Sequence, residues 1–221
     1  MILVIDTETT GREPPEVIEL AYMNLDGEGQ VRRFKPSIPS AFGAKAVHHI
    51  LDAELEGAPG SASACLPGAC TYIIGHNIDY DWKALGQPPI KRICTLAIAR
   101  TVWPQQDSHS LGACIYAHWP EAEARTLVKE AHGAWADAYM CMLLYKRLTA
   151  DYLVSSGKSS LTIQDIYSWS EACRIPSIIS FGKHKGTPIS SIPLDYRQWI
   201  LRQPDMDPYL VKAVRESMGK R

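Results

Sequence analysis

The sequence predicts an α/β fold in which a mixed five-stranded sheet is flanked by helices, followed by a small C-terminal α/β module. Three observations predict this arrangement. Three segments with strand patterns follow one another over the first 35 residues, separated by short turns. Two more strand segments then alternate with helical patterns, which is typical of strands joined by helices. Beyond residue 160 a second, shorter series of helical and extended segments begins.

The strand segments differ in how much of each strand is expected to be buried. Ile2–Ile5 is an unbroken apolar run, typical of a strand buried on both faces. The next two strands form an antiparallel meander through a hairpin turn at residues 26–29, and Pro36 ends the third strand. The five expected strands are residues 2–5, 17–25, 30–35, 71–75 and 91–94.

Helical patterns follow the last two strands. Asn77 is a suitable N-cap for a helix that begins at Ile78. Residues 134–145 contain one charged side chain, Asp137, so their helix is expected to be buried on nearly all sides. The expected helices of the main domain also include residues 95–103, 110–119 and 134–148.

The chain is expected to divide at Ser155–Ser160, whose Ser, Gly and Lys composition is typical of a flexible linker. Residues 1–154 would then form the main domain and residues 161–221 the small basic module. Thr162 and Asp165 have the spacing of a capping pair. The module is expected to contain a helix at 162–173, a strand at 177–181, a turn at 182–186, and helices at 194–203 and 208–218.

Charge and composition limit the function. The chain carries a formal charge of −1, but residues 174–221 hold nine Lys and Arg against four acidic residues, a balance of +5, which leaves −6 for the first 173 residues. An acidic body and a basic tail suggest a metal site in the first and polyanion contact by the second. Six cysteines without CxxC spacing, no signal peptide and no apolar stretch of membrane-spanning length indicate a cytosolic protein with no membrane partner.

Asp6 and Glu8 follow the first strand segment at a spacing of two, so both side chains point to the same side of the strand. Two carboxylates so close repel one another, and a divalent cation bound by oxygen ligands would relieve the repulsion. The alternative is a strand end whose carboxylates reach water.

Asp137 lies inside the apolar helix, where an unpaired carboxylate would be costly. The cation bound by Asp6 and Glu8 would also neutralise the Asp137 carboxylate. The alternative is a buried ion pair between Asp137 and an Arg or Lys. His132 precedes Asp137 by five residues, about 140° of helical rotation, so it is expected to lie in the loop before the helix. There it would act as a general base beside bound metal, or else have a structural role.

A fourth acidic residue follows the fourth strand. Asp79 is placed where a carboxylate favours the helix macrodipole, and Asp81 lies one turn into the helix. Spacing alone does not choose between them.

Three ordered motifs carry a resemblance: Asp6-Thr-Glu8, His76-Asn-x-x-Tyr-Asp81 and His132-x-x-x-x-Asp137. Together they resemble the DEDDh (DnaQ-like) 3′–5′ exonuclease superfamily over residues 1–150. A closer likeness to one group within that superfamily extends over nearly the whole chain. It is carried by the chain length, by the helix start Cys94-Thr95-Leu96 and by the tail motif Phe181–Gly186. The fifth strand here ends in Cys94-Thr95 where many relatives have Asp-Thr.

The resemblance implies an RNase H-like fold, selects Asp81 over Asp79, and makes His132 the general base. It implies two Mg²⁺ or Mn²⁺ ions, the first held by Asp6, Glu8 and Asp137 and the second by Asp6 with help from Asp81. Hydrolysis at DNA 3′ ends, single-stranded or duplex, would release nucleoside 5′-monophosphates, in repair or mismatch processing. The expected substrate contacts are Thr7, Thr9, Thr10, His48, Lys183 and Lys185.

Two alternatives remain open on the sequence. One is an exoribonuclease of the same superfamily, because no residue pattern distinguishes ribose from deoxyribose. The other is a catalytically silent nucleic-acid-binding or polymerase-accessory subunit, although such proteins usually lose acidic residues that are present here. Lys183 and Lys185 would contact phosphates, or would simply lie on a solvated hairpin. Oligomeric state is not determined by the sequence.

Overall fold

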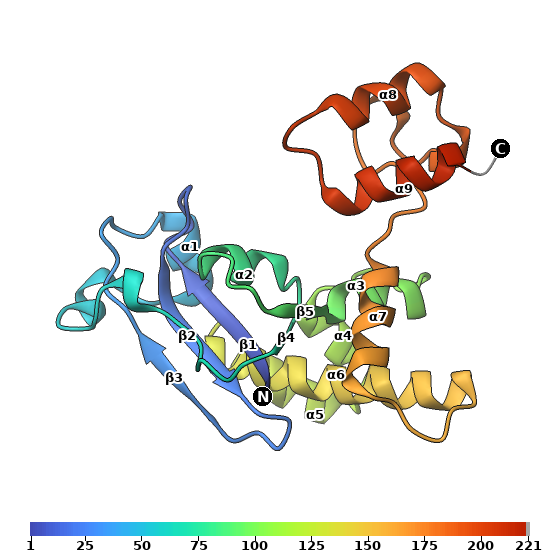
Figure 1. Ribbon diagram of the computed structural model, residues 1–221. Helices are drawn as coiled ribbons and strands as arrows, with labels where there is room; N and C mark the ends of the chain where they lie inside the picture. Colours follow the sequence, from blue (N-terminus) through green and yellow to red (C-terminus); the bar gives the residue numbers. More distant parts are fainter. Residues whose placement is uncertain (220–221) are drawn as a thin grey trace. The chain divides into compact units, whose positions relative to one another are not determined.

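The computed structural model describes residues 1–219 and contains a five-stranded mixed sheet in the order β3-β2-β1-β4-β5 (Figure 1). β1 pairs antiparallel with β2 and parallel with β4, so it lies in the middle of the sheet. This confirms the predicted mixed sheet and the antiparallel meander. The strands are β1 (Ile2–Thr9), β2 (Val17–Met23), β3 (Gly29–Arg33), β4 (Tyr72–Gly75) and β5 (Lys91–Cys94).

Helices cover both faces of the sheet, and short 3₁₀ turns connect several segments. The α-helices are α1 (Phe42–His48), α2 (Asp79–Ala84), α3 (Thr95–Val102), α4 (Leu111–His118), α5 (Glu121–Lys129), α6 (Ala134–Ser156), α7 (Ile163–Cys173), α8 (Leu194–Arg202) and α9 (Pro208–Gly219). The 3₁₀ helices are η1 (Asp52–Leu55), η2 (Ser61–Ser63), η3 (Gly182–His184) and η4 (Ile189–Ser191). No described helix is long and apolar enough to cross a bilayer.

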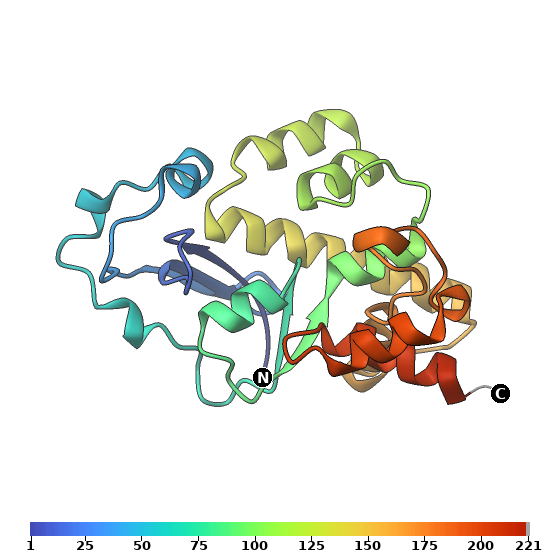
Figure 2. The same cartoon turned by 90° about the horizontal axis from the view of Figure 1, so that it is seen from above.

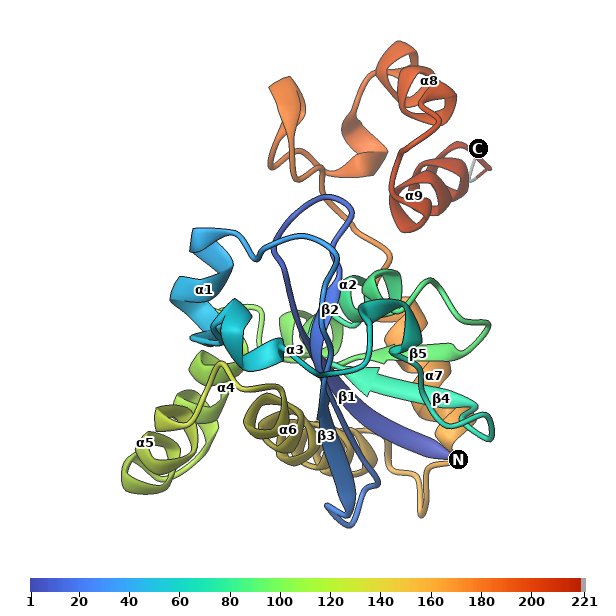
Figure 3. The same cartoon turned by 90° about the vertical axis from the view of Figure 1, so that its left-hand side faces the viewer.

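α6 is the central helix of the fold. It packs against β1, β2 and β4, and Figures 2 and 3 show it between the sheet and the pair α4–α5. Its buried residue Met140 packs with Ile115 of α4 and Ala124 of α5. Leu3 and Ile5 pack in a separate cluster with Ile73. Val4, on the opposite face of β1, is also fully buried, so β1 is buried on both faces, as its apolar run predicted.

The turn after β4 differs from expectation. Asn77 is not the N-cap: it adopts a left-handed conformation (φ 70°), and the residue before α2 is Ile78. The backbone turns sharply here, since a Cβ on Gly75 would lie 2.6 Å from the Cδ1 atom of Ile78. Asn tolerates left-handed backbone better than most residues, which accounts for its presence in this turn.

The chain forms two compact units, Met1–Ser170 and a second that begins at Glu171. The expected boundary at 155–160 differs from this division, because most of α7 packs on the first unit. The Ser170 hydroxyl accepts a hydrogen bond from the Cys94 N–H at 2.8 Å, and the rings of Tyr152 and Trp169 stack at 4.0 Å. The Thr162–Asp165 capping pair forms as predicted.

The second unit has its own core, and its described residues are mainly helical. Ile179, Ile192 and Ile200 are among its buried residues. The strand expected at 177–181 is reduced to an isolated bridge between Ile178 and Pro188, because the segment pairs with its neighbour at too few positions to form a ladder. The two terminal helices, α8 and α9, lie where the sequence predicted them.

Candidate metal and nuclease site

Three carboxylates from two elements meet at the C-terminal end of β1. Asp6 and Glu8 lie on β1, and Asp137 lies in the first turn of α6. One ligand oxygen from each lies within 4.8 Å of the others. The packing of α6 on β1 thus brings together acidic residues that are far apart in the sequence.

Repulsion and burial both disfavour the ionised forms of these groups. Burial raises the pKa of Asp6 well above its ordinary value, and nearby acidic groups, Asp81 first among them, add to the effect. Burial, then the neighbouring Asp137 and Glu19, raises the pKa of Glu8 to about 8. Burial also raises the pKa of Asp137. Without a cation, the cluster is therefore expected to hold protons at neutral pH.

Asp81 is the fourth acidic residue, and Thr7 holds it in place. Both the N–H of Thr7, at 2.9 Å, and its hydroxyl, at 2.7 Å, donate to Oδ1 of Asp81. Asp81 is buried, which raises its pKa to about 7 despite these two hydrogen bonds. Asp79, by contrast, forms an ion pair with Arg92. The structure thus places Asp81, and not Asp79, beside the residues of β1.

His132 lies outside the helix, as expected from its spacing. It is exposed and adopts a left-handed conformation (φ 71°), two residues before α6 begins. Its backbone N–H is 3.4 Å from both carboxylate oxygens of Asp137. The loop that carries the imidazole is therefore tied to one of the clustered carboxylates.

Glu19 is a residue of the site that the sequence analysis did not identify. It is buried on β2, and its Cα pairs with that of Glu8 in the antiparallel register. One carboxylate oxygen accepts from Arg33 at 3.0 Å and the other from the Ala134 N–H at 3.1 Å. The sequence does contain a signal for Glu19, because it is the one acidic residue in the otherwise apolar strand segment Val17–Ala21.

The expected contacts to the terminal nucleotide have internal partners. Thr7, Thr9, Thr10 and His48 are all buried. The Thr9 hydroxyl lies 2.6 Å from that of Tyr80, and the Thr10 hydroxyl accepts from the Glu16 N–H. The Thr9 and Thr10 hydroxyls form hydrogen bonds within the protein. They would therefore influence substrate binding by fixing the shape of the site and not by direct contact.

The two ring nitrogens of His48 differ. Its Nδ1 accepts a hydrogen bond from the Ile50 N–H at 2.9 Å, while its buried Nε2 has no hydrogen-bond partner among residues 1–219. Burial lowers the pKa of this histidine, which favours its neutral form. Lys183 and Lys185, the other expected contacts, are exposed in the second unit.

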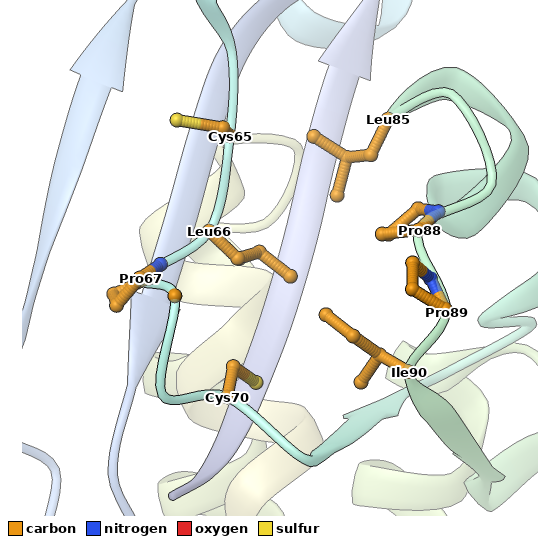
Figure 4. Close-up of a pocket in the computed structure, with 9 residues that line it drawn as sticks. Cys65, Leu66, Pro67, Cys70, Leu85, Pro88, Pro89 and Ile90 are labelled. Atoms are coloured by element: carbon orange, nitrogen blue, oxygen red, sulfur yellow. The ribbon is translucent and has the colours of Figure 1, made fainter.

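A cavity of about 340 Å³ lies away from the acidic cluster (Figure 4). It opens between the segments that precede β4 and β5, at the start of these parallel strands, whereas Asp6 and Glu8 lie toward the end of β1. The described residues that line it include no carboxylate, so it does not extend the candidate site. The lining residues are Cys65, Leu66, Pro67, Gly68, Cys70, Leu85, Pro88, Pro89 and Ile90.

The acidic cluster fits a divalent cation. Its donors are all carboxylate oxygens, the set preferred by Mg²⁺ and Mn²⁺. Their raised pKa values show that positive charge is needed if all are to be ionised together. Asp6, Glu8 and Asp137 would hold the ion directly, and Asp81 lies beside them.

Comparison with known proteins finds exonucleases among the relatives of this chain. No family model matches the chain. Exodeoxyribonuclease 10 of Escherichia coli K12 is 25% identical over 226 residues, a match that covers 95% of each chain. The protein of the same name from Escherichia coli O6:H1 matches equally.

Two solved structures support the fold. Exonuclease X in complex with 5′ overhanging duplex DNA is 26% identical, with a TM-score of 0.57 over 76% of this chain and 99% of that one. The zinc-bound ExoI–ssDNA complex of E. coli is 20% identical, with a TM-score of 0.51 over 70% of this chain and 42% of that one. The expected RNase H-like fold is thereby confirmed.

Proposed function

We propose that this chain is a member of the DnaQ-like 3′–5′ exonuclease superfamily and a metal-dependent nuclease that removes nucleotides from the 3′ ends of DNA, as its likeness to Exodeoxyribonuclease 10 and Exonuclease X supports. The observation that carries the proposal is the convergence of Asp6, Glu8 and Asp137, whose ligand oxygens lie within 4.8 Å of one another. DNA is favoured as the substrate because the relative that matches 95% of the chain is named an exodeoxyribonuclease. A reducing cytoplasm suits the six free cysteines.

The acidic residues would hold two Mg²⁺ or Mn²⁺ ions. Asp6, Glu8 and Asp137 would bind the first and Asp6 the second, with Asp81 assisting. Such ions supply a lowered pKa for the attacking water and neutralise charge on the phosphodiester. Thr7 contributes by directing its N–H and hydroxyl to Asp81, which keeps that carboxylate oriented toward the cluster.

His132 would act as the general base. It would take a proton from water as the water oxygen forms its bond to phosphorus, and the bond between phosphorus and the 3′ oxygen would break in line. The departing 3′ oxygen takes up a proton from solvent, and the product is a nucleoside 5′-monophosphate. The exposure of His132 and its attachment to Asp137 through the backbone N–H support this role.

One assay tests the proposal. Single-stranded DNA, duplex DNA and RNA of equal length, each labelled at the 5′ end, are incubated with Mg²⁺ or with chelator. We expect stepwise shortening of DNA from the 3′ end only with Mg²⁺, and much slower shortening of RNA. Shortening in chelator would refute the metal assignment, faster RNA cleavage would make the chain an exoribonuclease, and no cleavage would favour a non-catalytic binding subunit.

A further inference from the structure

The second unit presents two aromatic rings side by side on α8. Tyr196 and Trp199 are three residues apart, a spacing that places side chains on the same side of a helix. Their ring centroids are 5.3 Å apart and their planes differ by 25°. Trp199 is 40% exposed, which leaves part of a large apolar ring in solvent.

The core of the unit does not account for this exposed ring. Buried residues such as Ile179, Ile192 and Ile200 form that core, and Tyr196 packs against it from one side. Trp199 stacks on Tyr196 and is 40% exposed. Burial in the core therefore does not account for the exposed part of its ring.

Side chains of the turn at 182–186 lie against the Tyr196 ring. Lys183 Nζ is 5.7 Å from the centroid of the Tyr196 ring, and the His184 ring meets that of Tyr196 edge-on at 4.5 Å. Gly182 and Gly186 have positive φ angles of 64° and 84°, which shape this turn. The turn and α8 thus form one surface, which combines two stacked rings with the amino group of Lys183, and Lys185 lies exposed in the same turn.

The charge of the unit matches a polyanion. Residues 174–221 carry a balance of +5. Asp195 and Asp207, two of the four acidic residues in this stretch, accept backbone N–H groups at the starts of α8 and α9. Lys183 and Lys185 are both exposed at the turn. A negatively charged ligand with flat rings would fit both features.

We propose that the second unit carries a binding site for single-stranded DNA, in which Tyr196 and Trp199 stack with unpaired bases and Lys183 and Lys185 contact phosphates. Aromatic stacking tolerates any base, and lysine contacts to phosphate are independent of sequence. Paired bases are already stacked within a duplex, so the rings favour single strands. The naming of DNA rests on the proposed function of the chain.

The test measures equilibrium binding by the full chain in chelator, so that no DNA is cleaved. The probe is fluorescein-labelled (dT)₃₀, read by anisotropy, beside a blunt 30-base-pair duplex. We expect Trp199→Ala to weaken (dT)₃₀ binding by about tenfold, within the range known for loss of one stacking ring. Trp199→Phe keeps a ring and should bind within about threefold of the unchanged chain.

Two further variants complete the design. Lys183→Ala with Lys185→Ala should weaken binding and reduce the slope of log affinity against log salt by about 1.4, the value for two lost phosphate contacts on a single strand. Leu194→Ala is the matched control, because it removes another exposed apolar side chain from α8. It should bind as the unchanged chain does.

The outcomes separate this proposal from the proposed function. Unchanged (dT)₃₀ affinity in Trp199→Ala would overturn the binding site, as would an equal loss of affinity for the duplex. Because binding is measured without cleavage, loss of affinity in this variant would support the site even if the chain hydrolysed no DNA. If the chain hydrolyses DNA but Trp199→Ala binds (dT)₃₀ as the unchanged chain does, the binding site on the second unit is refuted and the proposed nuclease function stands.

Discussion

The backbone N–H of Ala134 donates a hydrogen bond to Glu19 at 3.1 Å, although 115 residues separate the two. Ala134 is the first residue of α6, between His132 and Asp137 in the sequence. Glu19 also accepts from Arg33 on β3 and pairs with Glu8 across the β1–β2 register. A single carboxylate therefore connects the sheet to the helix start that carries both proposed catalytic groups.

Removal of Glu19 should impair catalysis through position. Glu19→Ala leaves the buried Ala134 N–H unpaired, which costs about 1–3 kcal/mol of stability, and it frees the start of α6 to shift. We expect kcat to fall about tenfold or more while KM for DNA changes little. Glu19→Gln keeps an acceptor and should restore most of kcat; if both variants are equally impaired, the charge and not the hydrogen bond is what matters.

Loss of a clustered carboxylate should abolish activity without unfolding the chain. We expect Asp6→Ala and Asp137→Ala to reduce Mg²⁺-dependent release of mononucleotides by at least about 10³-fold, because each removes a ligand and a fixed charge near the reacting phosphate. In chelator both variants should melt at or above the temperature of the unchanged chain, since repulsion within the cluster is relieved.

Asp79→Ala is the matched control for these variants. Asp79 lies two residues from Asp81 but pairs with Arg92. Release of mononucleotides by this variant should remain within a few-fold of that by the unchanged chain. Retained activity in Asp6→Ala or Asp137→Ala would refute their assignment as metal ligands.

The pH dependence of stability should differ with and without metal. The pKa of Glu8 is raised from 4.5 to about 8, and that of Asp81 from 3.8 to about 7. Between these limits the Glu8 and Asp81 carboxyls bind more protons in the folded chain than in the unfolded chain, so the stability that they contribute in chelator should fall as pH rises from about 4 to about 8. Mg²⁺ favours the ionised carboxylates and should offset this fall. Thermal melting at several pH values, with chelator or Mg²⁺, checks this; parallel curves would contradict it.

His132→Ala should separate catalysis from metal binding. The imidazole is exposed, and the contact to Asp137 is made by the backbone N–H, which alanine retains. We expect kcat to fall about 10²- to 10⁴-fold, the usual loss for a general base. Manganese affinity, measured by calorimetry, should stay near that of the unchanged chain. A large loss of metal affinity would instead point to a structural role for this histidine.

Thr7→Val should change the acidic limb of the pH–rate profile. The variant loses the hydroxyl that donates to Asp81 at 2.7 Å, a hydrogen bond that lowers the pKa of this buried carboxyl. Its pKa should therefore rise further, and the rate should reach its plateau at a higher pH. Thr7→Ser keeps the hydroxyl and should follow the unchanged profile; identical profiles for Val and Ser would show that the hydroxyl has no part in this titration.

The sequence by itself determined the features that depend on local periodicity. The apolar run before Asp6 predicted a strand buried on both faces, and the spacing of Asp6 and Glu8 predicted that both carboxylates share one side. The lone charge of an apolar helix singled out Asp137 in the same way. These inferences succeed because burial repeats with the period of the strand or helix that carries it.

Only the tertiary structure decided which distant groups meet. No local pattern relates Glu19 to Ala134, or Thr7 to Asp81, because each contact depends on how α6 and α2 pack on the sheet. The division of the chain after Ser170 likewise depends on α7 packing against the first unit, although Ser155–Ser160 has the composition of a linker. Composition reports what a segment can do locally, whereas packing decides what it contacts.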